Sequence, residues 1–387
     1  MRTSDVFELL RDGAPRTRAQ LADASGMARS TIAARIDVLM RLGLVAPYGG
    51  GVSTGGRPPS LLAMNPRARV VAGVDIGASH ATAGLADLAG TILAERRADL
   101  DVATGPDHVL GWAEKVISEL LDDQHRKASE LSAIGIGLPG PVEHSTGRAI
   151  NPPIMPGWDR YDVPAHVQRA FKVPVLIDND VNIMALGEQH AHLPDVHDLV
   201  FIKVSTGIGA GLISGGELQR GAQGTAGDLG HVRVVRADGV ICRCGNEGCL
   251  EAIAAGPALA RALQMQGVAA ETGQDVVDLV RRGDPVAGQV VRQAGRDLGE
   301  VVATLVNVIN PSAIVIGGAM ADAGESLIAG IREVVYQRSL PLATEHLTIA
   351  TSQAGERAGV IGAAALAISH VLSPAAIDKA SVQLTGS

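Results

Sequence analysis

The stretch VVAGVDIGASHATAGLADLAGTILAE, residues 70–95, decides the fold of most of this chain. Its pattern predicts a buried strand, a glycine turn, a second strand and a hairpin at residues 88–90. The stretch LVFIKVSTGIGAG, residues 199–211, repeats the order of strand, glycine turn and strand. Such an internal repeat predicts a duplicated fold, in which two similar α/β lobes enclose a cleft.

Further elements complete each lobe. A helix is expected over residues 107–121, and strands over residues 133–137, 173–177 and 313–316. We place the first lobe at residues 70–184 and the second at residues 185–387. A C-terminal helix over about residues 356–370 is expected to pack back on the first lobe.

The composition of the 387-residue chain fits this fold class. Aromatic residues make up only 2% and there are 47 glycines, so the cores must be built from Ala, Val, Leu and Ile. The N-terminus has no long apolar run of the kind found in signal peptides, and the apolar stretch at residues 358–368 is too short to span a bilayer. We therefore expect a soluble, cytoplasmic protein with no membrane partner.

Charge is distributed unevenly along the chain. Residues 1–69 hold ten Arg and no Lys against five acidic residues, whereas the remainder holds 23 basic and 36 acidic residues. A basic head on an acidic body indicates that the head meets a polyanion. An ordinary solvated surface is the alternative, and charge alone does not separate the two.

Residues 1–69 carry the pattern of a winged helix-turn-helix. A short first helix, a second from the N-cap Thr17 to Ala24, and a third over about residues 28–42 are expected. The third helix has an apolar stripe and an opposite face that is small, polar and Arg-bearing, as in helices that lie in the major groove. The residues of that face assigned to DNA contacts are Arg29, Ser30, Ala34 and Arg35.

A glycine- and proline-rich segment follows. GGGVSTGGRPPSLLAMNP, residues 49–66, predicts a β-hairpin wing with its tip at residues 55–59. Glycines at the tip allow close approach to DNA, and Arg57 can enter a narrow minor groove. The alternative is a small helical bundle for protein contacts, and the basic charge and the wing favour DNA over it.

Five motifs carry a specific family resemblance. They are GLPGPV at 137–142, DNDVN at 178–182, STGIGAG at 205–211, GAQGTAGDLGH at 221–231 and CRCGNEGCLE at 242–251. With these motifs the chain resembles the ROK family of repressors, open reading frames and sugar kinases over essentially its whole length. The resemblance implies a two-lobed, actin-like and ribonuclease H-like sugar-kinase fold behind the DNA-binding head, with a structural zinc ion.

The cysteines indicate the same metal. All three, Cys242, Cys244 and Cys249, are clustered, and an odd clustered set in a cytoplasmic chain indicates metal binding rather than disulfides. With His231 they provide one imidazole and three thiolates, a closed tetrahedral set that zinc favours. Three free thiols beside a surface histidine are the alternative.

A sugar pocket is also expected. Sugars are recognised by planar donors and acceptors that chelate adjacent hydroxyl groups, and the resemblance places His231 in such a pocket. The residues assigned to it are Asn179, Asp180, Asp228, His231 and Glu251. In family kinases the residue matching Asp180 is the general base, whereas in a sensor it would only hydrogen-bond the same hydroxyl. One ring nitrogen of His231 would bind the metal and the other would donate to the sugar. Helix capping by Asn179 is the alternative and is compatible with ligand contact.

Two departures from the family pattern bear on function. Asp228 replaces the usual Glu and sets its carboxylate back by one methylene. Residues 75–80 are Asp-Ile-Gly-Ala-Ser-His where kinases of the family have DIGGTK, which adds a Cβ near the phosphates and removes a positive charge. Binding of ATP and magnesium is therefore expected to be impaired. The residues assigned to the nucleotide loops are Asp75, Gly77, Ser79, Thr206, Gly207, Gly209, Gly317 and Gly318.

Two functions are consistent with this sequence. The first is a sugar-responsive regulator, expected to repress carbohydrate-metabolism genes from a palindromic operator as a homodimer or a dimer of dimers. The alternative is an ATP-dependent, glucokinase-like kinase that carries a DNA-binding head and uses Asp180 as its catalytic base. We favour the regulator because of its head and its altered first loop.

Overall fold

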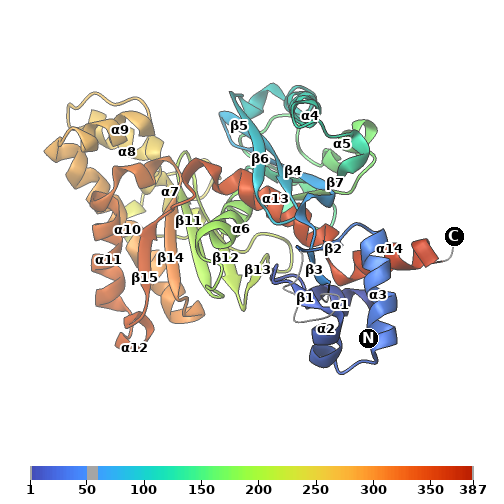
Figure 1. Cartoon of the computed structure of the whole chain (residues 1–387). Coiled ribbons are helices and arrows are strands. Elements are labelled where there is room, and N and C mark those ends of the chain that lie inside the picture. Colours follow the sequence, from blue (N-terminus) through green and yellow to red (C-terminus); the bar gives the residue numbers. More distant parts are fainter. Residues whose placement is uncertain (1, 50–59, 386–387) are drawn as a thin grey trace.

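The computed structural model describes residues 2–49 and 60–385, and it has a small N-terminal head and two larger lobes (Figure 1). The head contains α1 (Thr3–Glu8), α2 (Arg18–Ser25), α3 (Arg29–Arg41) and a three-stranded sheet in the order β1 (Arg16–Thr17), β3 (Leu61–Met64), β2 (Val45–Pro47). Thr17 caps α2 by accepting the N–H of Gln20, and Gly26, at φ 68°, ends it. The predicted helix-turn-helix is confirmed, and β2 pairs antiparallel with β3, whereas the predicted wing tip at residues 55–59 lies outside the described residues.

The first lobe is built on a five-stranded sheet in the order β10-β7-β4-β5-β6. Its strands are β4 (Val70–Ile76), β5 (His80–Asp87), β6 (Ile92–Asp99), β7 (Leu131–Leu138) and β10 (Val175–Asn179). Two helices, α4 (Pro106–Asp123) and α5 (Val163–Ala170), belong to this lobe, as does a short hairpin of β8 (Val142–Glu143) and β9 (Arg148–Ala149).

The second lobe has a sheet in the order β13-β12-β11-β14-β15. Its strands are β11 (Leu199–Val204), β12 (Ile208–Ser214), β13 (Glu217–Gln219), β14 (Ala313–Gly317) and β15 (Thr348–Thr351). Its helices are α7 (Glu251–Ala254), α8 (Gly256–Gln264), α9 (Gly273–Arg281), α10 (Pro285–Ile309), α11 (Glu325–Arg338) and α12 (Pro341–Thr344).

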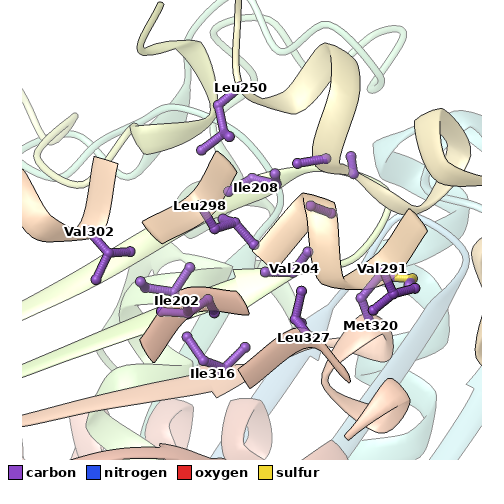
Figure 2. Packing of buried hydrophobic residues seen from close by; sticks show 14 of the residues in the cluster. Ile202, Val204, Ile208, Leu250, Val291, Leu298, Val302, Ile316, Met320 and Leu327 are labelled. Atoms are coloured by element: carbon purple, nitrogen blue, oxygen red, sulfur yellow. The ribbon is translucent and has the colours of Figure 1, made fainter. Parts of the chain in front are cut away.

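The two sheets have the same topology. In each, the central strand (β4 or β11) pairs antiparallel with the next strand of the chain and parallel with β7 or β14 on its other side. The predicted duplication is therefore confirmed. In the second lobe, Ile202 and Ile316 on the sheet pack beneath Leu298 of α10, in a core without aromatic rings (Figure 2).

The lobes meet where two helices cross, α6 (Asp180–His192) and α13 (Ala358–Val371). A Cβ on Gly187 would collide with the carbonyl of Ala358, and a Cβ on Gly362 would collide with the carbonyl of Ile183. Glycine is therefore required on both helices so that their backbones can touch. The same α13 also packs on β4 and β7 of the first lobe.

We expect Gly362→Ala to destabilise the protein by about 1–3 kcal/mol, because the added methyl group must push α6 and α13 apart. The matched control is Gly111→Ala in α4, where an added Cβ has no heavy atom within 4 Å. That substitution should stabilise by about 0.5–1 kcal/mol through helix propensity. Urea unfolding of both full-length variants checks the pair, and changes of the same sign would contradict this account of the crossing.

The chain ends in a further helix, α14 (Pro374–Thr385), that sequence analysis did not predict. Figure 1 shows α13 leading from between the lobes to α14, which lies beside the head. Ile377 of α14 and Leu372 before it share one apolar cluster with Phe7 and Leu39 of the head. Asp378 accepts hydrogen bonds from the N–H (3.0 Å) and the hydroxyl (2.9 Å) of Ser4. The head is thus packed against α14 and the C-terminal end of α13, the helix that crosses α6 between the lobes.

Among the described residues, no single helix has both the length and the apolar character needed to cross a membrane. The helical segments around α13 and α14 reach that threshold only when taken together as a pair bent by 47°.

Candidate functional site

Four metal-ligating side chains converge just before α7. His231 closes a 3₁₀ turn, and Cys242, Cys244 and Cys249 lie on the loop that follows. Their ligand atoms all lie within 4.8 Å of one another. The His231 Nδ1 is 3.7 Å from the Cys242 sulfur, and the Cys244 and Cys249 sulfurs are 3.7 Å apart. These separations suit four ligands around one ion at about 2.0–2.3 Å, so the cluster can hold a metal such as zinc.

The surroundings of the thiols explain what a metal would contribute. Burial raises the pKa of Cys249 to about 12 and also raises the pKa of Cys242, whereas the backbone N–H of Asn246 lowers the pKa of Cys244. Both shifts favour the protonated form of the two buried thiols when no cation is bound. A bound metal ion deprotonates its thiol ligands, and this links folding of the loop to metal binding.

His231 connects the cysteines to the predicted sugar pocket. While its Nδ1 faces the Cys242 sulfur, its Nε2 lies 3.9 Å from the Asp228 carboxylate. The two ring nitrogens therefore point to the two different sites that the sequence assigned to this residue. The Asp228 side chain is about half exposed, with 53% of its area accessible, which leaves its carboxylate open to a ligand.

The strand β12 brings together further residues that sequence analysis assigned to the sugar pocket. Its first residue, Ile208, donates its N–H to Glu251 Oε2 at 3.0 Å. Two residues further on, the strand is hydrogen-bonded to Gly227, which directly precedes Asp228. The same strand packs against the start of α6, where Asp180 lies. The structure therefore places Glu251, Asp228 and Asp180 around one strand.

Asn179 has a structural role in this arrangement. Its side-chain oxygen caps α6 by accepting the N–H groups of Val181 (2.9 Å) and Asn182 (3.4 Å). Its amide nitrogen donates to the carbonyl of Gly140 at 2.8 Å, which fixes the loop after β7. The amide is thus already engaged on both sides, and contact with a sugar stays a prediction for this residue.

Sequence reasoning missed two basic residues at the site. Lys203, on β11, has its ammonium nitrogen 2.5 Å from Asp180 Oδ2. Arg220 donates to the buried carboxylate of Asp178 at 2.7 Å, and Asp178 also accepts from Asn182. A lone lysine in an otherwise apolar strand was the available signal for Lys203. Arg220 stands directly before the motif at 221–231, and that position was its only signal.

The first loop that the sequence assigned to the nucleotide is covered by the side chain of its own His80. Gly77 donates its N–H to the carbonyl of His80 at 2.8 Å, and the His80 ring lies over the turn, 2.6 Å from where a Cβ on Gly77 would be. Burial raises the pKa of Asp75 to about 7, with the Lys203 charge acting in the opposite direction. Ser79 is exposed at the tip of this loop.

The loops of the second lobe lie side by side at the ends of parallel strands. Gly209 and Gly317 are the sheet neighbours of Lys203 on its two sides. Gly207 adjoins the Glu251 carboxylate, and Gly318, at φ 81°, approaches the carbonyl of Val204. Thr206 is exposed.

The structure gives the exposure of the face of α3 that sequence analysis assigned to DNA contacts. Ile32, Ile36 and Leu39 of α3 are buried, whereas Arg29, Ser30 and Ala34 are exposed and Arg35 is half-buried. The structure describes no ion pair of Arg29 or Arg35 with residues 2–49 or 60–385, so their charges are available to a polyanion. Arg57 lies outside the described residues.

The comparisons with known proteins identify the family. The ROK family model matches residues 71–370. The chain belongs to the ROK family. In addition, the IclR helix-turn-helix domain matches residues 1–47, which is the head of this ROK protein.

Relatives of this ROK protein include both regulators and kinases. It is 31% identical over 386 residues to the xylose repressor of Caldicellulosiruptor bescii, covering 95% of each chain. The crystal structure of a ROK family transcriptional regulator, a homologue of the Escherichia coli MLC protein, matches with a TM-score of 0.84, 26% identity and 98% coverage of both chains. A ROK glucokinase from Streptomyces griseus, solved with glucose and AMPPNP, matches with a TM-score of 0.64 and 29% identity, over 77% of this chain and 99% of the kinase.

Proposed function

We propose that this ROK protein is a sugar-responsive transcription repressor whose two-lobed body senses the sugar and whose head binds the operator. The observation that carries this function is the combination of a helix-turn-helix with a ROK body, together with the 31% identity to a xylose repressor over 95% of both chains. The exposed, Arg-bearing face of α3 supports DNA binding by the head.

The sugar site of this proposal is the region around β12. Asp228, Glu251 and His231 offer a carboxylate, a second carboxylate and a ring nitrogen to adjacent hydroxyl groups. A structural zinc ion on His231, Cys242, Cys244 and Cys249 would hold the ring in place, since the Nδ1 of His231 faces the thiols. A sugar that binds one arrangement of the lobes more tightly than the other would shift the protein toward that arrangement.

We further propose a homodimer, or a dimer of dimers, on a palindromic operator. Exposed apolar side chains at the end of the second lobe support self-association. They are Val308 at the end of α10, Tyr336 near the end of α11, Leu340 just before α12 and Leu342 on α12. A two-fold dimer would present two α3 helices to the two halves of a palindrome.

A kinase activity is the second candidate, favoured by the similarity to the Streptomyces griseus glucokinase. The two candidates differ in what Asp180 does. In a kinase, Asp180→Asn abolishes sugar-dependent ADP release because the general base is lost. In a repressor there is no ADP release to lose, and the substitution changes only the affinity for the sugar.

Operator binding in the presence of sugars tests the proposed function. DNA fragments would be enriched from a random pool by the full-length protein, and the affinity for the best fragment measured against pentoses, hexoses and amino sugars. We expect one sugar to change the affinity at least about tenfold, which corresponds to about 1.4 kcal/mol of coupling. If no fragment is enriched, or if a sugar binds without changing DNA affinity, the proposal is wrong.

The contact between α14 and the head offers a route for this coupling. Asp378→Ala removes both acceptors that hold the first turn of α1 through Ser4. We expect faster amide exchange in α1 and a sugar effect on operator affinity that falls toward none. The control is Lys379→Ala, which changes the neighbouring exposed side chain of α14. Equal exchange and an equal sugar effect in the two variants would exclude this route.

A further inference from the structure

A largely buried cation lies where β11 of the second lobe packs against α6. Lys203 belongs to the apolar strand β11, and only 19% of its side chain is accessible. Its nitrogen lies 2.5 Å from Asp180 Oδ2 at the start of α6. The residues beside it in the sheet are Gly209 and Gly317, where an added Cβ would meet the side chain of Val181 or the ring of Phe201, respectively.

The Lys203 ammonium pairs with one of the two carboxylates that a kinase of this fold would need and acts electrostatically on the other. Asp180 receives Lys203 on one oxygen and the N–H of Val181 (2.9 Å) on the other. Asp75, the second acidic residue, is buried at the end of β4 against the start of α13 and is subject to the electrostatic influence of the same ammonium. Such a partner weakens a carboxylate both as a proton acceptor and as a magnesium ligand. An ion-paired carboxylate is a weaker base, and it attracts a further cation less strongly than an unpaired one does.

The first loop also conflicts with a bound nucleotide. The His80 imidazole lies over the turn at Gly77, where backbone N–H groups would have to face the phosphates. The Gly77 N–H is already donated to the His80 carbonyl. The residues present therefore do not fit a magnesium–nucleotide complex, although the fold is shared with kinases.

We propose that Lys203 is the resident cation of the predicted cleft, where it takes the place of the metal and holds Asp180 as a fixed acceptor for a sugar hydroxyl. Sugar binding is then independent of magnesium and ATP. The role of the cleft in sugar binding rests on the proposed function, whereas the replacement of the metal by Lys203 does not. Lys203 is a positioning residue for Asp180.

Binding of Mn²⁺ alone to the zinc-saturated, full-length protein tests the replacement, with free Mn²⁺ followed by electron paramagnetic resonance. Lys203→Met has a side chain of similar length without the charge, and it leaves Asp75 and Asp180 uncompensated. We expect it to bind Mn²⁺ at least about tenfold more tightly than the wild-type protein, a difference of about 1.4 kcal/mol. Lys203→Arg should behave as the wild type, and Lys203→Met with Asp75→Asn should lose the gained site.

Equal Mn²⁺ affinity in the wild type and Lys203→Met would overturn the proposal. A second measurement uses only the wild-type protein, so it tests the proposal even if Lys203→Met does not fold. Calorimetry of the wild type should give the same sugar affinity with and without MgATP, and no ADP should form. A sugar affinity that requires MgATP would also overturn it. If no sugar binds at all, the proposed function fails, and the Mn²⁺ result still decides the role of Lys203.

Discussion

Arg29→Glu is expected to lower operator affinity by about 100-fold. Arg29 is the exposed first residue of α3, the helix assigned to the major groove. Loss of one good base contact costs about 1–3 kcal/mol, and the new negative charge adds repulsion from the phosphates. Folding should be unaffected, because a carboxylate is favourable in the first turn of a helix. Fluorescence anisotropy with labelled operator at several salt concentrations measures the effect.

The control for this prediction is Arg282→Glu, the same substitution at an exposed position of the second lobe. Both variants carry the same net charge, so a general effect of charge on DNA binding would appear in both. Sugar binding should be unchanged in both. If Arg29→Glu binds operator as well as Arg282→Glu, α3 is not the recognition helix.

A point substitution is preferable to removal of the head. Phe7 and Leu39 share their apolar cluster with Leu372 and Ile377. Deleting residues 1–69 would expose the latter two, and an exposed apolar patch favours aggregation. A loss of function in the truncated chain would then have two explanations, whereas Arg29→Glu leaves this packing intact.

The elements of the fold were predictable because they depend on local patterns. The repeat of strand, glycine turn and strand at residues 70–95 and 199–211 led directly to two sheets of equal topology. The apolar stripe of α3 gave the helix-turn-helix in the same way. By contrast, α14 makes its contacts with a segment at the other end of the sequence, since Asp378 and Ser4 are 374 residues apart. No local pattern contains that information.

The site was predictable in its residue types and less so in its pairings. The candidate metal ligands were recognised because three thiols and a histidine are clustered in a short stretch. The partner of Asp180 was missed, because it comes from a strand whose other residues serve the core. The consequence is mechanistic: the residue assigned as a possible general base is held by an ammonium group.

Cys244→Ser is expected to remove the metal and, with it, the sugar response. The hydroxyl of serine is a poor zinc ligand, and three remaining ligands leave an open position. Cys242 and Cys249 are buried, and burial favours their protonated forms once no cation is bound. The affinity for the sugar should fall at least about tenfold, because His231 loses the ion that orients its ring. Loss of an orienting partner at a metal site typically lowers metal affinity or activity by about 10–100-fold. Colorimetric zinc determination and calorimetry with the sugar measure the two effects.

The control is Arg243→Ser, which places the same side chain at the neighbouring exposed position of the loop and leaves all four ligands in place. It should retain one zinc per chain and the sugar response. Operator binding without sugar should persist in both variants, since the apolar cluster that holds the head contains no residue of 231–249. A Cys244→Ser protein that lacks zinc but still responds to sugar would show that the metal does not organise the pocket, and His231 would then be held by Asp228 and the loop backbone alone.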